Sequence, residues 1–513
     1  MLKVGSTIFA RRLLASCVAL AGLSIAELRS NAEGLFRQPS DATVPGYSAA
    51  PARSEPLPYD PLKECNIVSE WDRPIVPPRL FAELIDYQFN DYQFLSSELL
   101  RPPADKPAEK DKPDSKPAEK KEKKWYEKLS IRGYTQVRIN GASEAEDSPA
   151  PPQYVSDGSV RNNQGFIIRR ARIIISGDVH DNVSVYLQPD FASSIPGVTD
   201  AIEFAQIRDF YADIYLNTDK VNRIRVGQSK IPYGWEDLQS SSNRLPLDRN
   251  DAFNSGVKNE RDIGVFYYWT PEYAQELYKY VLDENLKGSG NYGVLGLGIY
   301  NGQGGSLAEV NESLHFVARF NVPYQFSNGQ IIEVGIQGYT GSYGVLSSSI
   351  FPLGVAPAMR PAGTVETGAI GMEDNRLGIN FIYYPQPFGF QTEWTWGSGP
   401  ELNAAQTAVE TNDLHGGYAM LLYKYETDCR GTLFPFVRYQ YYDGGYKSER
   451  NAPATHISEC EAGLEWQFNK YLELTTCYVF TDRTNTTALS TAGTPSYEQF
   501  IGSIFRMQLQ FSY

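Results

Sequence analysis

Strict alternation of apolar and polar residues over long runs is the feature that most constrains the fold of this chain. Residues 505–513 (FRMQLQFSY) carry an apolar or aromatic side chain at every second position, and residues 129–139, 183–191 and 462–468 repeat the pattern. A period of two places alternate side chains on opposite faces of a β-strand. Each run therefore predicts a strand with one apolar face and one polar face.

The length of the runs and the order of the connections favour a membrane barrel over a soluble sandwich. Strands in soluble proteins average about 5–6 residues, whereas many of these runs have the length of a tilted strand that crosses a bilayer, about 9–11 residues. Short connections alternate with long ones, the short being 177–182, 217–221, 384–388, 427–431 and 469–470 and the long 141–164, 232–260, 341–373 and 443–455. Short periplasmic turns and long external loops are typical of outer-membrane barrels.

We therefore predict an all-β fold, a transmembrane antiparallel β-barrel of about sixteen strands. The predicted strands are 129–140, 165–177, 183–191, 204–216, 222–231, 261–270, 292–301, 313–322, 330–341, 374–384, 389–397, 415–426, 432–442, 456–468, 471–481 and 498–513. Residues 271–291 are too long for a periplasmic turn, and we interpret them as an insertion; a hidden hairpin there would change the count by two. A barrel of this size has a lumen too wide for side chains to fill, so it holds water and forms a pore.

The N-terminus has the features of a secretory signal peptide. Basic residues precede an apolar, Ala-rich run at 13–23, and small residues follow, so we expect residues 1–32 to be removed by cleavage after Ala26 or Ala32. Export leaves four scattered cysteines in an oxidising compartment. Their spacing matches no metal site and defines no disulfide framework: they are Cys65, Cys429, Cys460 and Cys477. We expect neither a metal nor a cofactor.

We expect the segment between the signal peptide and the barrel to be periplasmic and largely disordered. Residues 33–100 are rich in Pro, with one candidate short helix at 79–100, and residues 101–124 form a Lys/Pro/Glu spacer that repeats Lys-Pro-Ala-Glu-Lys twice. We assign the outer-membrane porin β-barrel to residues 125–513. Acidic and basic residues balance in the first 125 residues, so the net charge of −14 lies in the barrel. This balance argues against nucleic acid as a partner.

Basic residues concentrate on the polar, lumen-facing side of the first five predicted strands. The candidates for a pore-lining anion path are Arg132, Arg138, Arg169, Arg170, Arg172, Arg223 and Arg225. Arg169 and Arg170 are adjacent and would point opposite ways in a regular strand, so one of them is expected at a rim or in a bulge. Guanidinium groups bind oxyanions through paired hydrogen bonds, and Arg-lined walls are expected in anion and phosphate pores. The alternative for any single arginine is a salt bridge within the wall, and acidic residues become denser in the later strands.

The long loop at 232–260 is expected to fold into the lumen and narrow it. It would bring Arg244, Arg249 and Lys258 to a constriction. The same loop carries acidic residues, including Glu236, Asp237, Asp248 and Asp251, so the sign of its local charge stays open.

Several stretches together resemble the family of phosphate-selective porins O and P. They are residues 165–177 (GFIIRRARIIISG), 187–191 (LQPDF), 225–234 (RVGQSKIPYG), 238–264 with its ending ERDIGV, 300–304 (YNGQG) and 508–511. The resemblance covers residues 126–513. It implies a homotrimer of sixteen-stranded barrels in which an arginine ladder and an inward loop select phosphate or polyphosphate, and it assigns Arg169, Arg170 and Arg172 to the ladder. The acid-rich later strands and the insertion at 271–291 depart from the family pattern.

We therefore expect an outer-membrane porin of a Gram-negative-type envelope, a water-filled channel that prefers small anions such as phosphate and is surrounded by outer-membrane lipid. No catalytic residue is expected. Catalysis by a Ser–His pair needs a nucleophile motif, and none accompanies the four histidines, His180, His315, His415 and His456. The alternative is a structural envelope protein, in which the barrel is an anchor and the N-terminal segment tethers the peptidoglycan cell wall.

Overall fold

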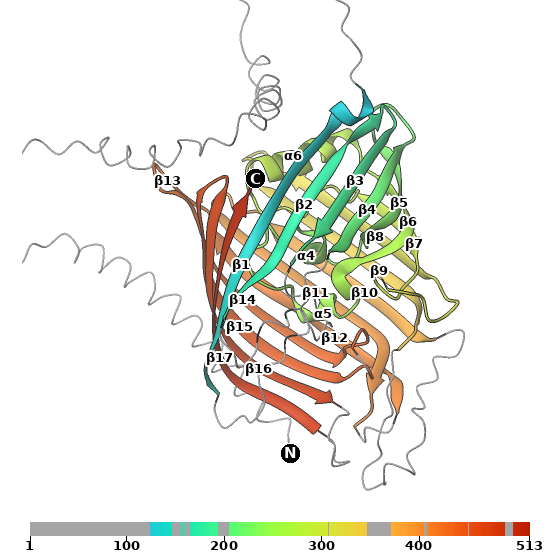
Figure 1. Ribbon diagram of the computed structural model, residues 1–513, viewed down its shortest axis with the longest axis vertical. Coiled ribbons are helices and arrows are strands. Elements are labelled where there is room, and N and C mark those ends of the chain that lie inside the picture. Colours follow the sequence, from blue (N-terminus) through green and yellow to red (C-terminus); the bar gives the residue numbers. More distant parts are fainter. Residues whose placement is uncertain are drawn as a thin grey trace, which may run out of the picture. The chain divides into compact units, whose positions relative to one another are not determined.

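The structure is a computed structural model (Figure 1) that describes residues 124–145, 154, 157, 160, 165–192, 205–305, 307–345, 371–404, 408–449, 451–487 and 496–513. The expected signal peptide, the Pro-rich segment and nearly all of the spacer therefore lie outside the described residues. None of the described helices is long and apolar enough to span a membrane.

Seventeen strands form one continuous antiparallel sheet. Their bounds are β1 Leu129–Ala145, β2 Phe166–His180, β3 Val183–Asp190, β4 Gln206–Tyr215, β5 Asn222–Lys230, β6 Arg261–Trp269, β7 Leu295–Tyr300, β8 His315–Gln325, β9 Ile331–Tyr343, β10 Met372–Tyr383, β11 Phe388–Leu402, β12 Val409–Tyr423, β13 Tyr425–Thr427, β14 Gly431–Gly445, β15 Ala454–Asn469, β16 Leu472–Thr487 and β17 Ser496–Ser512. Both β12 and its short continuation β13 pair with β14. The wall therefore has sixteen positions, which confirms the predicted barrel.

Closure of the sheet joins the two ends of the barrel sequence. β1 pairs with β2 on one side and with β17 on the other, where Val137 lies opposite Leu509. The last residue also takes part, because Gly133 and Tyr513 exchange two backbone hydrogen bonds of 2.7 and 2.9 Å. Closure leaves no open edge that another chain could pair with.

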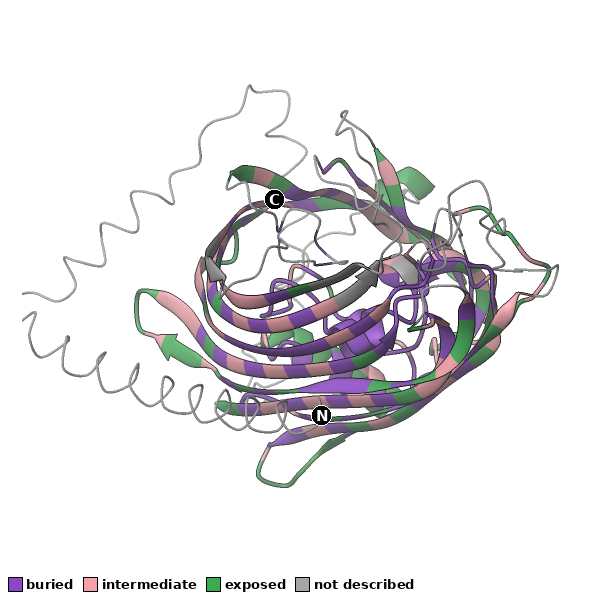
Figure 2. Ribbon diagram, turned by 90° about the horizontal axis from the view of Figure 1, so that it is seen from below, coloured by how far each residue is buried: buried purple, intermediate pink, exposed green. Residues whose placement is uncertain are grey.

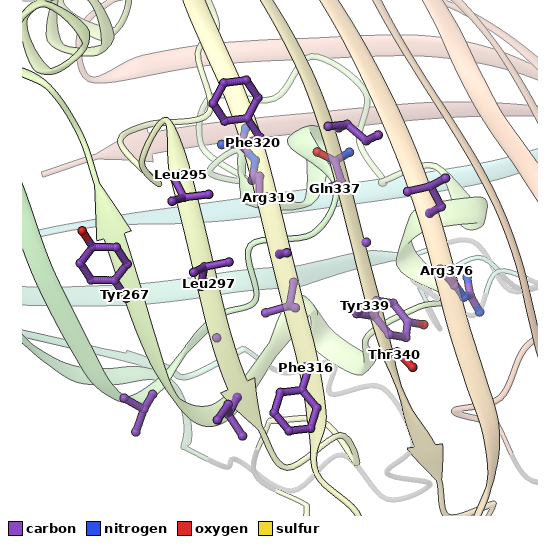
Figure 3. A pocket seen from close by; sticks show the side chains of 18 of the residues that line it. Tyr267, Leu295, Leu297, Phe316, Arg319, Phe320, Gln337, Tyr339, Thr340 and Arg376 are labelled. Carbon is purple, nitrogen blue, oxygen red and sulfur yellow. The ribbon is translucent and has the colours of Figure 1, made fainter.

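Burial alternates along the strands, as the period of two predicts (Figure 2). Leu297, Phe316 and Phe320 are 43–54% exposed on the outer face, whereas Arg319 is buried on the lumen side. In the wall formed by β5–β10 a pocket is lined mainly by apolar side chains, among them Leu295, Leu297, Phe316 and Phe320 (Figure 3). An apolar outer surface and a polar interior are what a bilayer around a water-containing lumen requires.

Each predicted strand corresponds to one wall position, but several strands are longer than predicted. β11 continues to Leu402, β12 begins at Val409 and β16 continues to Thr487. These extensions lie at the ends that carry the long connections. Beyond the bilayer the strands continue to pair through backbone hydrogen bonds, but their side chains no longer contact lipid, which imposes the alternation. The alternation of apolar and polar residues therefore does not predict where these strands end.

Helical segments lie in only a few of the described connections. A 3₁₀ turn, η1 (Trp125–Lys128), precedes β1, and α6 (Glu272–Asp283) lies between β6 and β7. The connection between β5 and β6 holds α4 (Trp235–Leu238), α5 (Asp251–Asn254) and the turn η2 (Lys258–Glu260). The insertion at 271–291 thus contains a helix and no hairpin, so the strand count of sixteen stands.

Candidate functional site in the lumen

The connection between β5 and β6, residues 231–260, runs inside the barrel and is called the inward loop below. Figure 2 shows buried helical segments enclosed by the wall, and Trp235 and Phe253 are fully buried. The backbone N–H groups of Trp235 and Glu236 donate to the carboxylate of Glu393 on β11, at 2.5 and 2.8 Å. The loop is therefore held against the wall opposite its own strands.

Aromatic packing fixes the middle of the inward loop. Tyr233 lies 5.2 Å from Phe253 and 4.9 Å from Tyr339 of β9, measured between ring centroids, and its hydroxyl contacts that of Thr395 at 2.6 Å. Asn250 caps α5 by accepting a hydrogen bond from the Phe253 N–H. These contacts fill one side of the lumen with protein, so the passage for solutes is narrowed.

The arginines of β1 and β2 lie together on the lumen side. Opposite Gln136 and Val137 the register of β2 shifts from Arg170 to Ile168, so Arg169 is the extra residue of a β-bulge. Because of this bulge both adjacent arginines are buried. A regular strand would have turned one of them toward the lipid.

Acidic side chains compensate much of this basic wall. Arg138 and Arg169 both pair with Asp157, Arg169 at 3.2 Å, and Arg172 pairs with Asp190 at 2.7 Å. For these three arginines the alternative of a wall salt bridge therefore applies.

The arginines of β5 are compensated in the same way. Arg225 makes two hydrogen bonds to Asp213, at 2.7 and 2.8 Å, and Arg223 lies 3.9 Å from the same carboxylate. The Arg225 guanidinium also stacks over Tyr211, 3.8 Å from the ring centroid. Arg132 lies near the periplasmic end of β1 and is exposed, and the described residues include no acid within ion-pair distance of it.

The predicted constriction residues have different environments. Arg249 pairs with Glu260 at 2.5 Å and with Asp237 at 3.4 Å. Arg244 donates only to backbone carbonyls of its own loop, those of Pro246 and Leu247, at 2.9 Å each. The side chain of Lys258 lies outside what the structure describes.

Two buried arginines thus lack an acidic partner among the described residues, Arg170 and Arg244. Arg170 donates to the amide oxygen of Gln136 at 2.8 Å, and the charge nearest to it is that of other arginines, including Arg244. Burial, together with repulsion from Arg249, lowers the pKa of Arg244 to about 9, so this side chain remains charged at neutral pH. The two guanidinium groups form a spot of positive charge in the lumen that no ion pair among the described residues neutralises, although Glu236, Asp248 and Glu260 attract Arg244 at longer range.

The acid that neutralises much of this wall is Asp157, which the sequence pattern did not predict. It belongs to the connection between β1 and β2, is fully buried, and pairs with Arg138, Arg169 and, at 2.8 Å, Arg506 of β17. Burial opposes ionisation, but attraction by the three arginines outweighs it and lowers the Asp157 pKa to about 2. A loop without periodicity contains no signal that would have placed this residue.

Several acidic residues of the later strands are also partnered. Glu333 accepts from Tyr384 and Asn321, and Glu465 pairs with Lys287. Asp237 of the inward loop differs, because burial outweighs the attraction of Arg249 and raises its pKa to about 8. The acid-rich half of the barrel therefore adds less free negative charge to the lumen than its composition indicates.

The histidines have no arrangement for nucleophilic catalysis among the described residues. His315 lies 3.1 Å from Asp374, which also binds Lys447, and His456 lies 3.4 Å from Asp443. In the same part of the chain no group of His, Cys, Asp or Glu side chains is arranged to hold a metal ion.

Comparison with known proteins gives a family match and several matches of fold. The sequence model of the family described as phosphate-selective porin O and P matches residues 152–513. The outer membrane channel DcaP of Acinetobacter baumannii is 14% identical, with a TM-score of 0.43, and the match covers 75% of this chain and 97% of that one. An anion-selective porin from Comamonas acidovorans is 10% identical, with a TM-score of 0.41 and coverage of 75% and 99%. OmpT of Vibrio cholerae in a trimer form is also 10% identical, with a TM-score of 0.40 and the same coverage. Comparison with curated proteins gives no significant match.

Proposed function

Because this chain belongs to the phosphate-selective porin O and P family, whose model matches residues 152–513, we propose that its outer-membrane channel prefers small oxyanions, phosphate among them. The closed sixteen-position barrel with a polar interior is suited to a channel. The preference for anions rests on the charge arrangement around Arg170 and Arg244.

The observation that carries the proposal is a local excess of positive charge in a barrel whose net charge is negative. Seven arginines and five acids lie together where β1, β2 and β17 meet the inward loop: Arg138, Arg169, Arg170, Arg172, Arg244, Arg249 and Arg506 against Asp157, Asp190, Glu236, Asp248 and Glu260. The excess of two positive charges attracts anions to this part of the passage. The net charge of −14 is spread over the whole chain and does not decide the sign there.

Guanidinium groups suit an oxyanion that must bind and then leave. A hydrogen bond to a charged group contributes about 1.5–3 kcal/mol, and salt screens part of this attraction in a lumen that holds water. Arg170 and Arg244 still have buried nitrogen atoms without a protein acceptor among the described residues, Nε and Nη1 respectively. Both nitrogen atoms are buried, so a phosphate in the passage is attracted by the positive charge of the two side chains and not bound by these donors.

The test is the reversal potential of the purified protein in a planar bilayer under a potassium chloride gradient, followed by titration of phosphate. The wild-type channel is expected to prefer chloride and to be blocked by phosphate, and Arg170→Gln and Arg244→Gln should each weaken both properties. Arg430→Gln is the matched control, because this arginine lies exposed in a periplasmic turn. A wild-type preference for potassium without phosphate block would refute the anion preference and leave the porin assignment intact.

We also propose a homotrimeric assembly, which the family resemblance implies, and export by a signal peptide at 1–32. Crosslinking of the protein in native membranes should give a trimer band, and N-terminal sequencing should place the cleavage after Ala26 or Ala32. A dimer band or an uncleaved N-terminus would contradict the respective proposal.

The alternative function, attachment to the cell wall, is supported by the repeated Lys/Pro/Glu spacer at 101–124. We propose it as a role of residues 33–124 that coexists with the channel. Deleting these residues should abolish the association of the protein with peptidoglycan and leave its conductance unchanged. Retention of the deleted variant on purified peptidoglycan would refute the tether.

A further inference from the structure

The connection between β6 and β7 is much longer than the other described connections at the same end of the barrel. It extends from Thr270 to Val294, whereas β2 and β3 are joined by two residues and β15 and β16 by two. Its helix α6 buries Ala274, Tyr278 and Val281, a spacing that places all three on one face. The helix therefore packs with that face against the barrel and leaves the other face in solvent.

One side of this insert is bound to β15. Lys287 forms an ion pair with Glu465, and both side chains are 1% exposed. Two residues earlier, the side-chain amide of Asn285 donates to the Gln467 amide oxygen at 2.6 Å. An ion pair buried to this degree is costly to break on one side, because the remaining charge is left without a partner. The ion pair therefore stabilises the contact between the insert and β15.

The other side of the insert is bound to β5 and β8. The Arg223 guanidinium donates to the carbonyl of Asn291 at 2.5 Å, and the Tyr278 hydroxyl donates to the carbonyl of Asn321 at 3.3 Å. In the closed sheet β5 and β15 are separated by many strands in either direction. The insert therefore crosses the lumen from one wall to the other.

The insert also contacts the inward loop. The Gln239 side-chain amide donates to the carbonyl of Lys287 at 2.7 Å, and that of Asn243 to the carbonyl of Gly288 at 2.8 Å. Trp235 of the loop shares a buried apolar cluster with Val281 of α6. The loop and the insert thus form one packed body inside the barrel.

We propose that residues 271–294 form a second constriction, at the periplasmic end of the pore, which limits conductance together with the inward loop. The insert does not cover the wall formed by β16, β17 and β1, where Ser241 and Ser242 of the inward loop contact Gln136 and Gln510. Arg132 is exposed at the periplasmic end of that wall, so its charge remains accessible to passing ions. This inference concerns the width of the pore and does not depend on the sign of the ions it prefers.

The test compares single-channel conductance of the full-length protein with that of a variant in which a short Gly-Ser turn replaces residues 272–290. Removing protein that fills the lumen should raise conductance at least about twofold, since a wider water-filled passage carries more ions. Lys279→Gln is the control within α6, because its side chain is 73% exposed and pairs only with Asp283. Its conductance should equal that of the wild type.

A second variant keeps the insert and weakens its attachment, in case the deletion prevents folding. Lys287→Met combined with Asn285→Ala removes both contacts with β15, so this side of the insert should detach at intervals and the current should step between the wild-type level and a larger one. Unchanged conductance in a correctly folded deletion variant, or a steady wild-type current in the double variant, would overturn the proposal. The reversal potential distinguishes the proposed anion preference from the proposed second constriction. A channel that prefers cations and whose conductance rises on deletion of the insert refutes the anion preference and supports the second constriction.

Discussion

Replacing Asp157 by Asn should increase the preference of the channel for anions. The carboxylate is shared by Arg138, Arg169 and Arg506 and is fully buried. The amide keeps the shape of the side chain and removes its charge. With Asp248, the group has three positive and two negative charges, so the substitution raises its net charge from one to two.

The expected size of the effect follows from Coulomb's law. One additional unit charge at about 4 Å contributes about 1 kcal/mol where water fills the passage, and about 4 kcal/mol at an effective dielectric constant of about 20. The lower figure is appropriate to a wet lumen and corresponds to about a fivefold increase in anion occupancy, given that about 1.4 kcal/mol is tenfold. The chloride-to-potassium permeability ratio should rise by about this factor.

The substitution should also destabilise the barrel at low salt. Removing one partner of a buried ion pair costs about 3–5 kcal/mol, but an anion attracted from solution by the three arginines can offset part of the loss. The temperature at which the folded, fast-migrating form is lost should therefore fall, and added phosphate should restore part of it.

The pH dependence of this effect has a definite sign. The folded-state pKa of Asp157 is depressed to about 2, below the usual value of about 3.9 for Asp. The stabilisation is therefore present above about pH 4 and is lost as the pH falls through 2. The difference between Asp157→Asn and the wild type should thus be the same at pH 5 and at pH 8.

The assay is the reversal potential of both proteins under the same salt gradient, with Asp428→Asn as the matched control. Asp428 lies exposed in a periplasmic turn, so its loss should not change the selectivity. An unchanged reversal potential for Asp157→Asn in a folded channel would refute the argument that this carboxylate masks positive charge in the passage.

Three further predictions address the inward loop, barrel closure and the fold. Burial, together with repulsion from Glu260, raises the Asp237 pKa to about 8. The anion preference should therefore fall between pH 7 and 9 as this carboxyl ionises, and the stability of the fold should fall as the pH rises from about 4, the usual Asp pKa, to 8. Asp237→Asn should abolish the change in reversal potential. In Gly133→Val the new Cβ would lie 2.4 Å from the Tyr513 ring, so the yield of folded, heat-modifiable protein should drop. Deletion of residues 511–513 should lower the yield in the same way. Normal yields would contradict the importance of the pairing between β1 and β17. Circular dichroism of the detergent-solubilised protein should show mainly β-structure, and a largely helical spectrum would be incompatible with the barrel.

The sequence by itself determined the barrel and the side of the wall on which its polar residues lie. Alternation is a local property, because each position of a membrane strand faces either lipid or lumen independently of distant residues. For this reason the parity of Arg138 and Arg225 could be assigned without a structure. Adjacency of Arg169 and Arg170 predicted a rim position or a bulge, since a regular strand cannot turn neighbouring side chains the same way, and the structure shows the bulge.

Only the tertiary structure decided which of these charges are free. Asp157 lies in a loop without periodicity, and its partner Arg506 is on the last strand, so no pattern along the chain connects them. The same holds for Lys287 of the insertion, whose position inside the lumen depends on Glu465, far along the sequence. Local alternation reports the medium that a side chain faces, whereas ion pairing depends on the paths of loops through space. The barrel could therefore be predicted from the sequence, and the charge of its passage could not.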